Sequence, residues 1–175
     1  RYTHATSSAA SDVYKRQAQG LIDGGVVAIM GADCSGVTTA IADNAAIPNG
    51  VVMISPSATS PALTSINDNG YFFRTAPSDA RGGEILANIT KDRRVKSVAI
   101  TYTNNDYGKG LADVYEYFVK SLGIKVTAVT AHEEGKADYG AEVATLAAAG
   151  GDALAVLGYL CLLYTSDAAD EVAGG

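Results

Sequence analysis

The sequence predicts an α/β protein built on parallel sheets, and two observations carry this prediction. Short runs of β-branched and aromatic residues alternate with segments whose apolar residues recur every three or four positions. This alternation is typical of βα units, in which a helix carries the chain back to start the next parallel strand. The alternation of strands and helices also starts again after Pro77, which follows a strand-like segment at 71–75. We therefore expect two sheet units, with the chain crossing between them near residues 75–78.

The expected strands are short apolar runs bounded by polar residues, glycine or proline. They lie at 26–31, 51–55, 71–75, 97–103, 125–131 and 153–158. None of them exceeds strand length, and no apolar run approaches the roughly 20 residues of a membrane-spanning helix.

Four helices are expected between these strands. They lie at 35–46, 78–91, around 111–122 and from about 138 to 149. The third is the clearest, because its apolar residues form one stripe and Gly123 follows it. The stripe consists of Leu111, Val114, Tyr115, Phe118 and Leu122. In the last helix we expect Val143, Leu146 and Ala147 to be buried.

The two ends of the chain lack these patterns. Residues 1–17 show neither strand nor helix periodicity, and residues 161–175 interrupt a sequence that was about to continue. Both ends are similar to adaptor or vector read-through, so we expect a non-native leader and a non-native tail there. The stretch between them divides into part of a first lobe at 18–76 and part of a second lobe at 77–160.

The composition argues against several functions. A formal net charge of −6 disfavours a nucleic-acid partner, because phosphate binding needs a basic stripe. The two cysteines, Cys34 and Cys161, lack the spacing of a zinc or redox motif. His4 and His132 lie far apart in polar surroundings and are interpreted as ordinary surface histidines. No metal and no cofactor are therefore expected.

The turn at 31–39 is the first candidate for chemistry. It follows a strand and opens a helix, which places backbone N–H groups at the carboxyl edge of the sheet and suits an anion. Val37 stands where a nucleotide-binding P-loop has lysine, and the spaced glycines of a dinucleotide site are absent. A carboxylate is therefore the preferred anion, with a plain helix cap at Ser35 as the alternative.

Two further loops and one tyrosine present polar groups at strand ends. Residues 54–63 carry hydroxyls on a backbone stiffened by two prolines, and residues 103–110 place Tyr107 before a helix. Tyr159 closes the last expected strand. Rigid loops at strand ends are where open α/β sheets bind ligands, and an aromatic ring there can wall a pocket. The alternatives are a solvated turn and tyrosines that only pack.

Five motifs follow one another along the chain, at 34–38, 54–63, 73–79, 105–113 and 138–143. They read Cys-Ser-Gly-Val-Thr, Ile-Ser-Pro-Ser-Ala-Thr-Ser-Pro-Ala-Leu, Phe-Arg-Thr-Ala-Pro-Ser-Asp, Asn-Asp-Tyr-Gly-Lys-Gly-Leu-Ala-Asp and Asp-Tyr-Gly-Ala-Glu-Val. In this order they resemble the type I periplasmic binding proteins for leucine, isoleucine and valine. The resemblance covers residues 18 to about 160. It implies two doubly wound parallel-sheet lobes joined by a hinge, here incomplete, with a ligand caught between strand ends.

The resemblance also implies a ligand site, carried over position by position. Its residues are Ser35, Ser57, Ala58, Thr59, Tyr107 and Tyr159. The first serine would meet an amino acid carboxylate, the Ser-Ala pair would offer backbone groups, and the threonine would contact both charged ends. The two tyrosines would face the ligand from the second lobe. The acid with which the family pairs the ligand ammonium is not among these residues, so we expect weak binding.

In function, the resemblance implies a non-enzymatic, monomeric substrate-binding component of an ABC transporter. Its partners would be a branched-chain or related amino acid and the transporter permease, and its location the periplasm or a lipid anchor outside the cell membrane. One alternative is a related sensor domain for amides, urea or aromatic acids. Another is an α/β enzyme with Cys34 or Ser35 as nucleophile, which would need a neighbouring base that the sequence does not offer.

Overall fold

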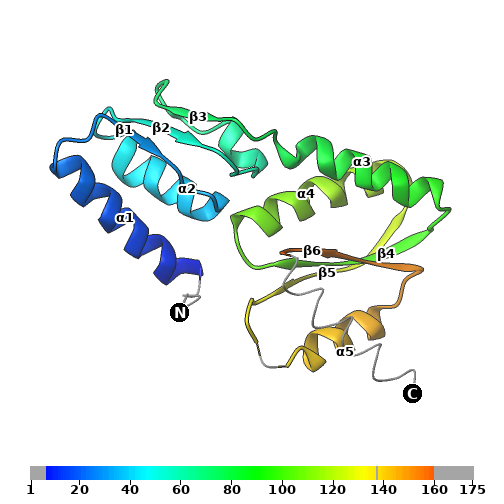
Figure 1. The fold of residues 1–175 in the computed structure, drawn as a ribbon. Coiled ribbons are helices and arrows are strands. Elements are labelled where there is room, and N and C mark those ends of the chain that lie inside the picture. The colour runs from blue at the N-terminus through cyan, green and yellow to red at the C-terminus, as the bar shows by residue number, and fades with distance from the viewer. Residues whose placement is uncertain (1–6, 137, 160–175) are drawn as a thin grey trace, which may run out of the picture.

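The computed structural model describes residues 7–136 and 138–159 (Figure 1). Within these residues the strands form two three-stranded parallel sheets, in the orders β1-β2-β3 and β5-β4-β6. The strands are β1 (Ala28–Met30), β2 (Val52–Ser55), β3 (Phe72–Arg74), β4 (Ser97–Thr103), β5 (Lys125–His132) and β6 (Ala153–Leu157). Each lies within two residues of its expected range. The separation of β2 and β4 into different sheets confirms the predicted restart of the βα pattern.

The first lobe, from α1 to β3, carries its helices on one face of the sheet. Helices α1 (Ser7–Asp23) and α2 (Ser35–Ile41) pack there together with the π-helical turn η1 (Ala42–Ala46) (Figure 1). Their apolar side chains form one core with Met53 and Phe72. Full burial of a side chain of this size stabilises the fold by roughly 1.5–3 kcal/mol.

The opposite face of this sheet is apolar and exposed. Met30 is in register with Ile54, and Ile54 is in register with Phe73, so the three side chains form a row across the strands. Their exposed fractions are 87%, 37% and 53%. Among the described residues, helices therefore cover only one face of the first sheet.

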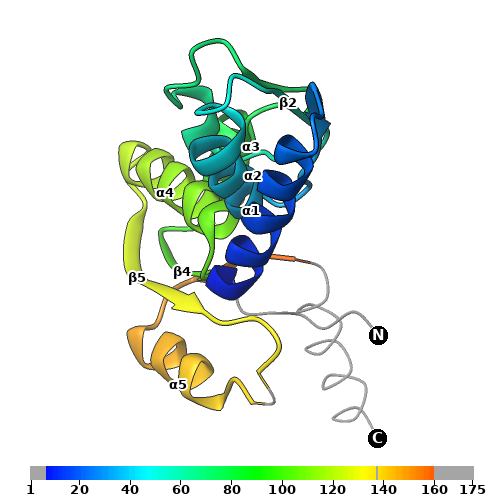
Figure 2. The same ribbon diagram turned by 90° about the vertical axis from the view of Figure 1, so that its left-hand side faces the viewer.

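The second lobe, from α3 to β6, has helices on both faces of its sheet. Helices α3 (Asp79–Asp92) and α4 (Asp106–Ser121) lie on one face, and α5 (Gly140–Ala149) lies on the other (Figures 1 and 2). Of the predicted apolar stripe on α4, Tyr115 is buried in the core, and Leu111, Phe118 and Leu122 pack against it partly buried. The prediction missed Ala112 and Val119, which are buried in the same core. Within this core the Tyr115 hydroxyl lies 2.8 Å from Thr90 Oγ1, so both buried hydroxyls have a partner.

The crossover between the lobes brings the strand ends of the first lobe to the start of the second. Thr75 N donates to Ser55 O at 3.1 Å, which keeps the crossover beside the end of β2. Ser78 then caps α3, because its hydroxyl accepts from Ala80 N at 3.2 Å. The 3₁₀ turn η2 (Pro61–Thr64), which follows β2, contacts α4. The loops that leave β1 and β2 thus face the second lobe.

The described part of residues 1–17 corrects the sequence analysis, which predicts no helix there. Helix α1 begins at Ser7 and continues to Asp23. Its C-terminal half packs on the first lobe, where Ala18 is buried, and such packing stabilises a helix whose own apolar stripe is weak. The side chains from residue 12 to residue 17 are exposed or half-buried. Residues 161–175 lie outside the described residues, and the division into leader, lobes and tail stays a prediction.

The expected burial of α5 is also partly wrong. Leu146 is buried, whereas Val143 is 61% exposed and Ala147 is exposed as well. Helix α5 contacts β5, an edge strand of the sheet, and its neighbour β4, and only one line of its apolar side chains is covered. None of the helices that the structure describes is long and apolar enough to cross a membrane.

Candidate functional site

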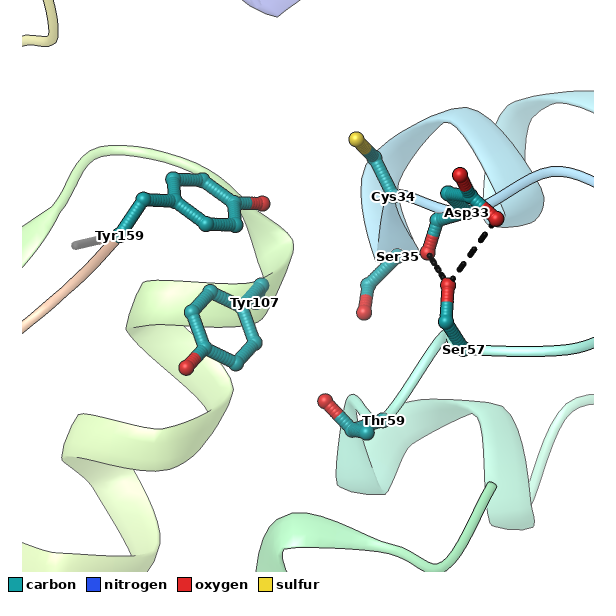
Figure 3. Close-up of a pocket in the computed structure, with 7 residues that line it drawn as sticks. All are labelled: Asp33, Cys34, Ser35, Ser57, Thr59, Tyr107 and Tyr159. Carbon is teal, nitrogen blue, oxygen red and sulfur yellow. Dashed lines mark hydrogen bonds between the residues drawn. The ribbon is translucent and has the colours of Figure 1, made fainter. Parts of the chain in front are cut away.

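A cavity of about 250 Å³ lies between the two lobes (Figure 3). It is lined by Asp33, Cys34, Ser35, Ser57, Thr59, Tyr107 and Tyr159. The first five of these residues belong to the first lobe: Ser35 begins α2, and the other four lie on the loops that follow β1 and β2. The two tyrosines belong to the second lobe. The volume is just below the roughly 300–1,000 Å³ of most small-molecule pockets. The cavity therefore suits a small ligand.

The parallel pairing of β1 and β2 explains why the first-lobe residues meet. Both strands end at the same edge of the sheet, so the chain leaves them side by side. Ser55 joins the two loops, because its buried hydroxyl donates to Ala32 O at 2.6 Å and accepts from Ala58 N at 3.1 Å. The loops therefore form one wall of the cavity. Because they are already held together, ligand binding costs little conformational entropy in ordering them.

Two serine hydroxyls on this wall are fixed by bonds within the first lobe. Ser35 is buried, and its Oγ accepts from Ser60 N at 3.1 Å. Ser57 Oγ donates to Asp33, with distances of 3.0 Å to the main-chain oxygen and 3.2 Å to Oδ1 (Figure 3). The hydroxyl of Ser35 thus keeps its own proton for another partner, whereas the proton of Ser57 is engaged.

Thr59 forms hydrogen bonds with the second lobe. Its hydroxyl lies 2.5 Å from Asp79 Oδ2, and Asp79 N donates to Thr59 O at 2.9 Å. Burial raises the pKa of the Asp79 carboxyl, while the bond from Thr59 and the charge of Arg74 act in the opposite direction. Arg74 also donates to Ser60 O at 2.8 Å, which holds the loop in place.

Ala58 differs from the other predicted site residues, because it does not line the cavity. Its side chain is fully buried in the core of the first lobe. Its N–H donates to Ser55, and its carbonyl accepts from Arg74 Nη1 at 3.2 Å. Both of its main-chain polar groups are thus engaged within the first lobe.

The second lobe contributes a pair of aromatic rings. Tyr107 lies in the first turn of α4, and Tyr159 follows the end of β6. Figure 3 shows both rings across the cavity from the first-lobe residues, with the Tyr107 hydroxyl directed away from them and the Tyr159 hydroxyl directed toward Cys34. Burial raises the pKa of both tyrosines, and the nearby carboxylate of Asp79 raises that of Tyr107 further. Both therefore stay neutral at physiological pH.

The structure thus brings five of the six predicted residues around one cavity: Ser35, Ser57, Thr59, Tyr107 and Tyr159. Sequence reasoning missed Asp33 and Cys34 as lining residues, although they directly precede Ser35 in the same turn. It also missed Asp79, which stands in the crossover motif at 73–79. No pattern in the sequence relates this residue to Thr59, twenty positions earlier.

His132 is not the surface histidine that the sequence suggests. It is 5% exposed, with Nδ1 at 2.8 Å from Thr101 Oγ1 and Nε2 at 3.3 Å from Thr103 Oγ1. Burial lowers its pKa. Cys34 is a free, exposed thiol, while His4 and Cys161 lie outside the described residues. In the part of the chain that the structure describes, no group of three or more His, Cys, Asp or Glu side chains could hold a metal ion.

Two α/β lobes with a polar wall and an aromatic wall around an interlobe cavity define a ligand-binding protein of the hinged, two-lobed class. Comparison with known families agrees, since residues 1–150 match the family described as the receptor family ligand binding region. The chain belongs to this family, within the type I periplasmic binding proteins of the branched-chain amino acid group.

Individual relatives support this assignment. The Leu/Ile/Val-binding protein homolog 3 of Brucella melitensis is 31% identical over 140 residues, which make up 79% of this chain and 38% of that protein. A leucine-binding protein of Thermotoga maritima has a similar structure, with a TM-score of 0.75 at 26% identity over 83% of this chain and 41% of that one. An ABC transporter substrate-binding protein of Desulfitobacterium hafniense in complex with Leu gives a TM-score of 0.62 at 27% identity, over 83% and 43% of the two chains.

These relatives are named as binding proteins. This chain spans about two fifths of their length, as the covered shares of 38% to 43% show.

Proposed function

We propose that this chain acts in an extracytoplasmic substrate-binding component of an ABC transporter and binds a branched-chain or related amino acid between its lobes. The observation that carries this proposal is the cavity, in which hydroxyls of the first lobe face two stacked tyrosines of the second. An amino acid has two charged ends and an apolar side chain, so it needs polar partners beside an apolar wall. The cavity offers both.

The ligand carboxylate is assigned to Ser35. The Ser35 hydroxyl accepts from Ser60 N, and no acceptor among the described residues takes its own proton. This proton is therefore available to a carboxylate. The rings of Tyr107 and Tyr159 provide the wall for an aliphatic side chain. A hydrogen bond to a charged group contributes about 1.5–3 kcal/mol. Two such bonds, one at each charged end of the amino acid, correspond to a dissociation constant in roughly the millimolar range.

The relatives favour this ligand class over the alternatives. The Brucella melitensis relative is named for leucine, isoleucine and valine, and the Desulfitobacterium hafniense structure contains Leu. Amides, urea and aromatic acids remain the alternative ligands within the same fold. The transporter permease as partner, a monomeric state and an extracytoplasmic location are proposed from the family. For an enzyme with Cys34 or Ser35 as nucleophile, His132 is unsuitable as the base, since threonine hydroxyls lie at both of its ring nitrogens.

A titration followed by ¹H–¹⁵N NMR tests the proposal. Addition of L-leucine to the full chain should shift the amide signals of Ser35, Thr59 and Tyr107 in a saturable way, with a dissociation constant of about a millimolar. Acetamide, urea and phenylacetate, added at equal concentrations, should shift these signals less. The proposal fails if leucine leaves the three amides unshifted well above the millimolar range, or if one of the other compounds binds more tightly.

A further inference from the structure

Two consecutive asparagines in the turn between β4 and α4 donate to two consecutive glutamates in the loop after β5. Asn104 Nδ2 lies 2.6 Å from Glu133 Oε1, and Asn105 Nδ2 lies 3.2 Å from Glu134 Oε1. The main-chain N–H of Asn104 also donates to His132 O at 2.9 Å. Because β4 and β5 are parallel, the turn and the loop leave the sheet at the same edge. These bonds hold the two segments together there.

The side chain of Asn105 is engaged at both ends of its amide. Its Oδ1 accepts from Gly108 N at 2.9 Å and thereby caps α4, whereas its Nδ2 donates to Glu134. An ionised carboxylate can only accept, so Glu134 needs a donor opposite it. Aspartate caps helices as well as asparagine does, but it has no donor to offer. The cap alone therefore does not require asparagine at this position, while the contact with Glu134 does.

Both tyrosines of the aromatic wall are within the influence of this contact. Tyr107 lies two residues after Asn105, in the first turn of the helix that Asn105 caps. Its ring stacks on that of Tyr159, which follows β6 (Figure 3). Burial raises the pKa of the Tyr159 hydroxyl, and the charge of Glu134 raises it further. Glu134 therefore acts on the helix of Tyr107 through Asn105 and on Tyr159 through its charge.

We propose that Asn105 is a positioning residue of the cavity: held by Glu134, it fixes the first turn of α4 and keeps the Tyr107 ring stacked on Tyr159 before a ligand binds. Neither Asn105 nor Glu134 lines the cavity, so both act through the aromatic wall. A wall that is ordered in advance costs less conformational entropy on binding, which improves affinity. The effect on affinity rests on the proposed function, whereas the stacking of the rings can be measured without a ligand.

Two substitutions at Glu134 separate the hydrogen bond from the charge. Glu134→Ala leaves the Asn105 amide without its partner but keeps the helix cap, so NOEs between the two tyrosine rings should weaken. The affinity for L-leucine, measured by NMR titration of the full chain, should fall by about threefold. Glu134→Gln is the matched control, because its amide oxygen still accepts from Asn105. It should keep the ring NOEs and change the affinity by less than about twofold.

An exchange of donor and acceptor tests whether the two residues act as a pair. Asn105→Asp keeps an acceptor for Gly108 N but sets a second carboxylate against Glu134, so the ring NOEs should weaken and the leucine affinity should fall by about fivefold. Adding Glu134→Gln to Asn105→Asp supplies a donor again, because the new amide can donate to the new carboxylate. The ring NOEs should then return, and the affinity should recover to within about twofold of the original chain.

Asn88→Asp is the control for bulk charge. It adds the same negative charge at an exposed position of α3, and it should leave the ring NOEs and the leucine affinity unchanged. The amide spectra of all variants should show that the fold is intact.

The possible results separate this inference from the proposed function. Unchanged ring NOEs in Glu134→Ala or in Asn105→Asp would overturn the role of Asn105. A double variant as weak as Asn105→Asp would overturn it too, because Asn105 would then not act through Glu134. Equal leucine affinities in all variants would leave the proposed function standing and remove Asn105 from it. If the ring NOEs follow the expected pattern but no chain binds leucine, the positioning of the rings stands and the proposed function fails.

Discussion

The rings of Tyr107 and Tyr159 stack with their centroids 5.1 Å apart and their planes 25° from parallel. One ring comes from the start of α4 and the other from the end of β6, so the pair joins two strand ends of the second lobe. Aromatic pairs in this geometry add about 0.5–1.5 kcal/mol to the area that they bury. The pair therefore forms a stiff wall opposite the first-lobe hydroxyls.

Tyr107→Ala should lower the affinity for L-leucine by roughly tenfold, because it removes the ring and leaves Tyr159 without its stacking partner. Tyr107→Phe keeps the ring. It should change the affinity by less than about threefold, since Figure 3 shows the Tyr107 hydroxyl directed away from the first-lobe residues. NMR titration of both variants measures this. An equal loss in the two variants would show that the hydroxyl, and not the ring, contacts the ligand.

Gly110→Ala should weaken leucine binding, because the added methyl group would crowd the contact between the two lobes. A Cβ atom at this position would lie 3.0 Å from Pro61 Cδ and 3.1 Å from Ser60 Oγ, which are on the loop that carries Thr59. Overpacking of this kind costs about 1–3 kcal/mol. We expect it to appear as a loss of leucine affinity of about tenfold. Gly20→Ala is the matched control, because nothing lies within 4 Å of its Cβ position. Equal affinities of the two variants would contradict the prediction.

Gly108→Ala should destabilise the second lobe. The added Cβ would clash with the main-chain oxygen of Thr103, at the end of β4, and a strand backbone cannot move aside as a flexible side chain can. We expect the free energy of unfolding in urea to fall by about 1–3 kcal/mol. Gly20→Ala, in an open helical position of α1, should instead gain about 0.5–1 kcal/mol. A Gly108→Ala variant as stable as the original chain would show that this close approach is wrong.

Acid should destabilise the fold through His132. Burial lowers the folded-state pKa of this histidine below its ordinary value of 6.5, so the unfolded chain binds the proton more readily. The stability from the neutral ring is therefore complete above about pH 6.5 and is lost as the pH falls through the folded-state pKa. Glu142 and Glu133 oppose the shift in part.

The measurement for His132 is thermal unfolding at about pH 7.5 and about pH 5.5. His132→Gln has no ring to protonate, so its change in Tm between these conditions should be smaller than that of the original chain. A titration of the ring proton signals by NMR gives the pKa directly. A folded-state pKa at or above 6.5 would be inconsistent with the buried position of the ring.

The fold could be predicted well because each strand and most helices have their own local pattern. The run at 97–103 is bounded by polar residues, and the structure has β4 over the same residues. The stripe of α4 likewise follows helical spacing. Helix α1 could not be predicted in this way, since it is stabilised by packing around Ala18 and not by a strong stripe of its own.

The candidate site could be predicted in outline, because parallel strands bring their following loops to one edge. Contacts between distant loops could not. The Thr59 and Asp79 bond depends on the path of the crossover. The burial of His132 depends on the register that sets it opposite Thr103 on β4. Such contacts carry no periodic signal in the sequence.

The most direct test of ligand binding between the lobes is an isotope-filtered NOE experiment with ¹³C-labelled L-leucine and the unlabelled chain. The leucine methyl groups should show NOEs to the ring protons of Tyr107 and Tyr159, and the leucine Hα should show NOEs to Ser35 or Thr59. Contacts from both lobes to one bound leucine would place the ligand in the cavity. Contacts to one lobe alone would contradict binding between the lobes.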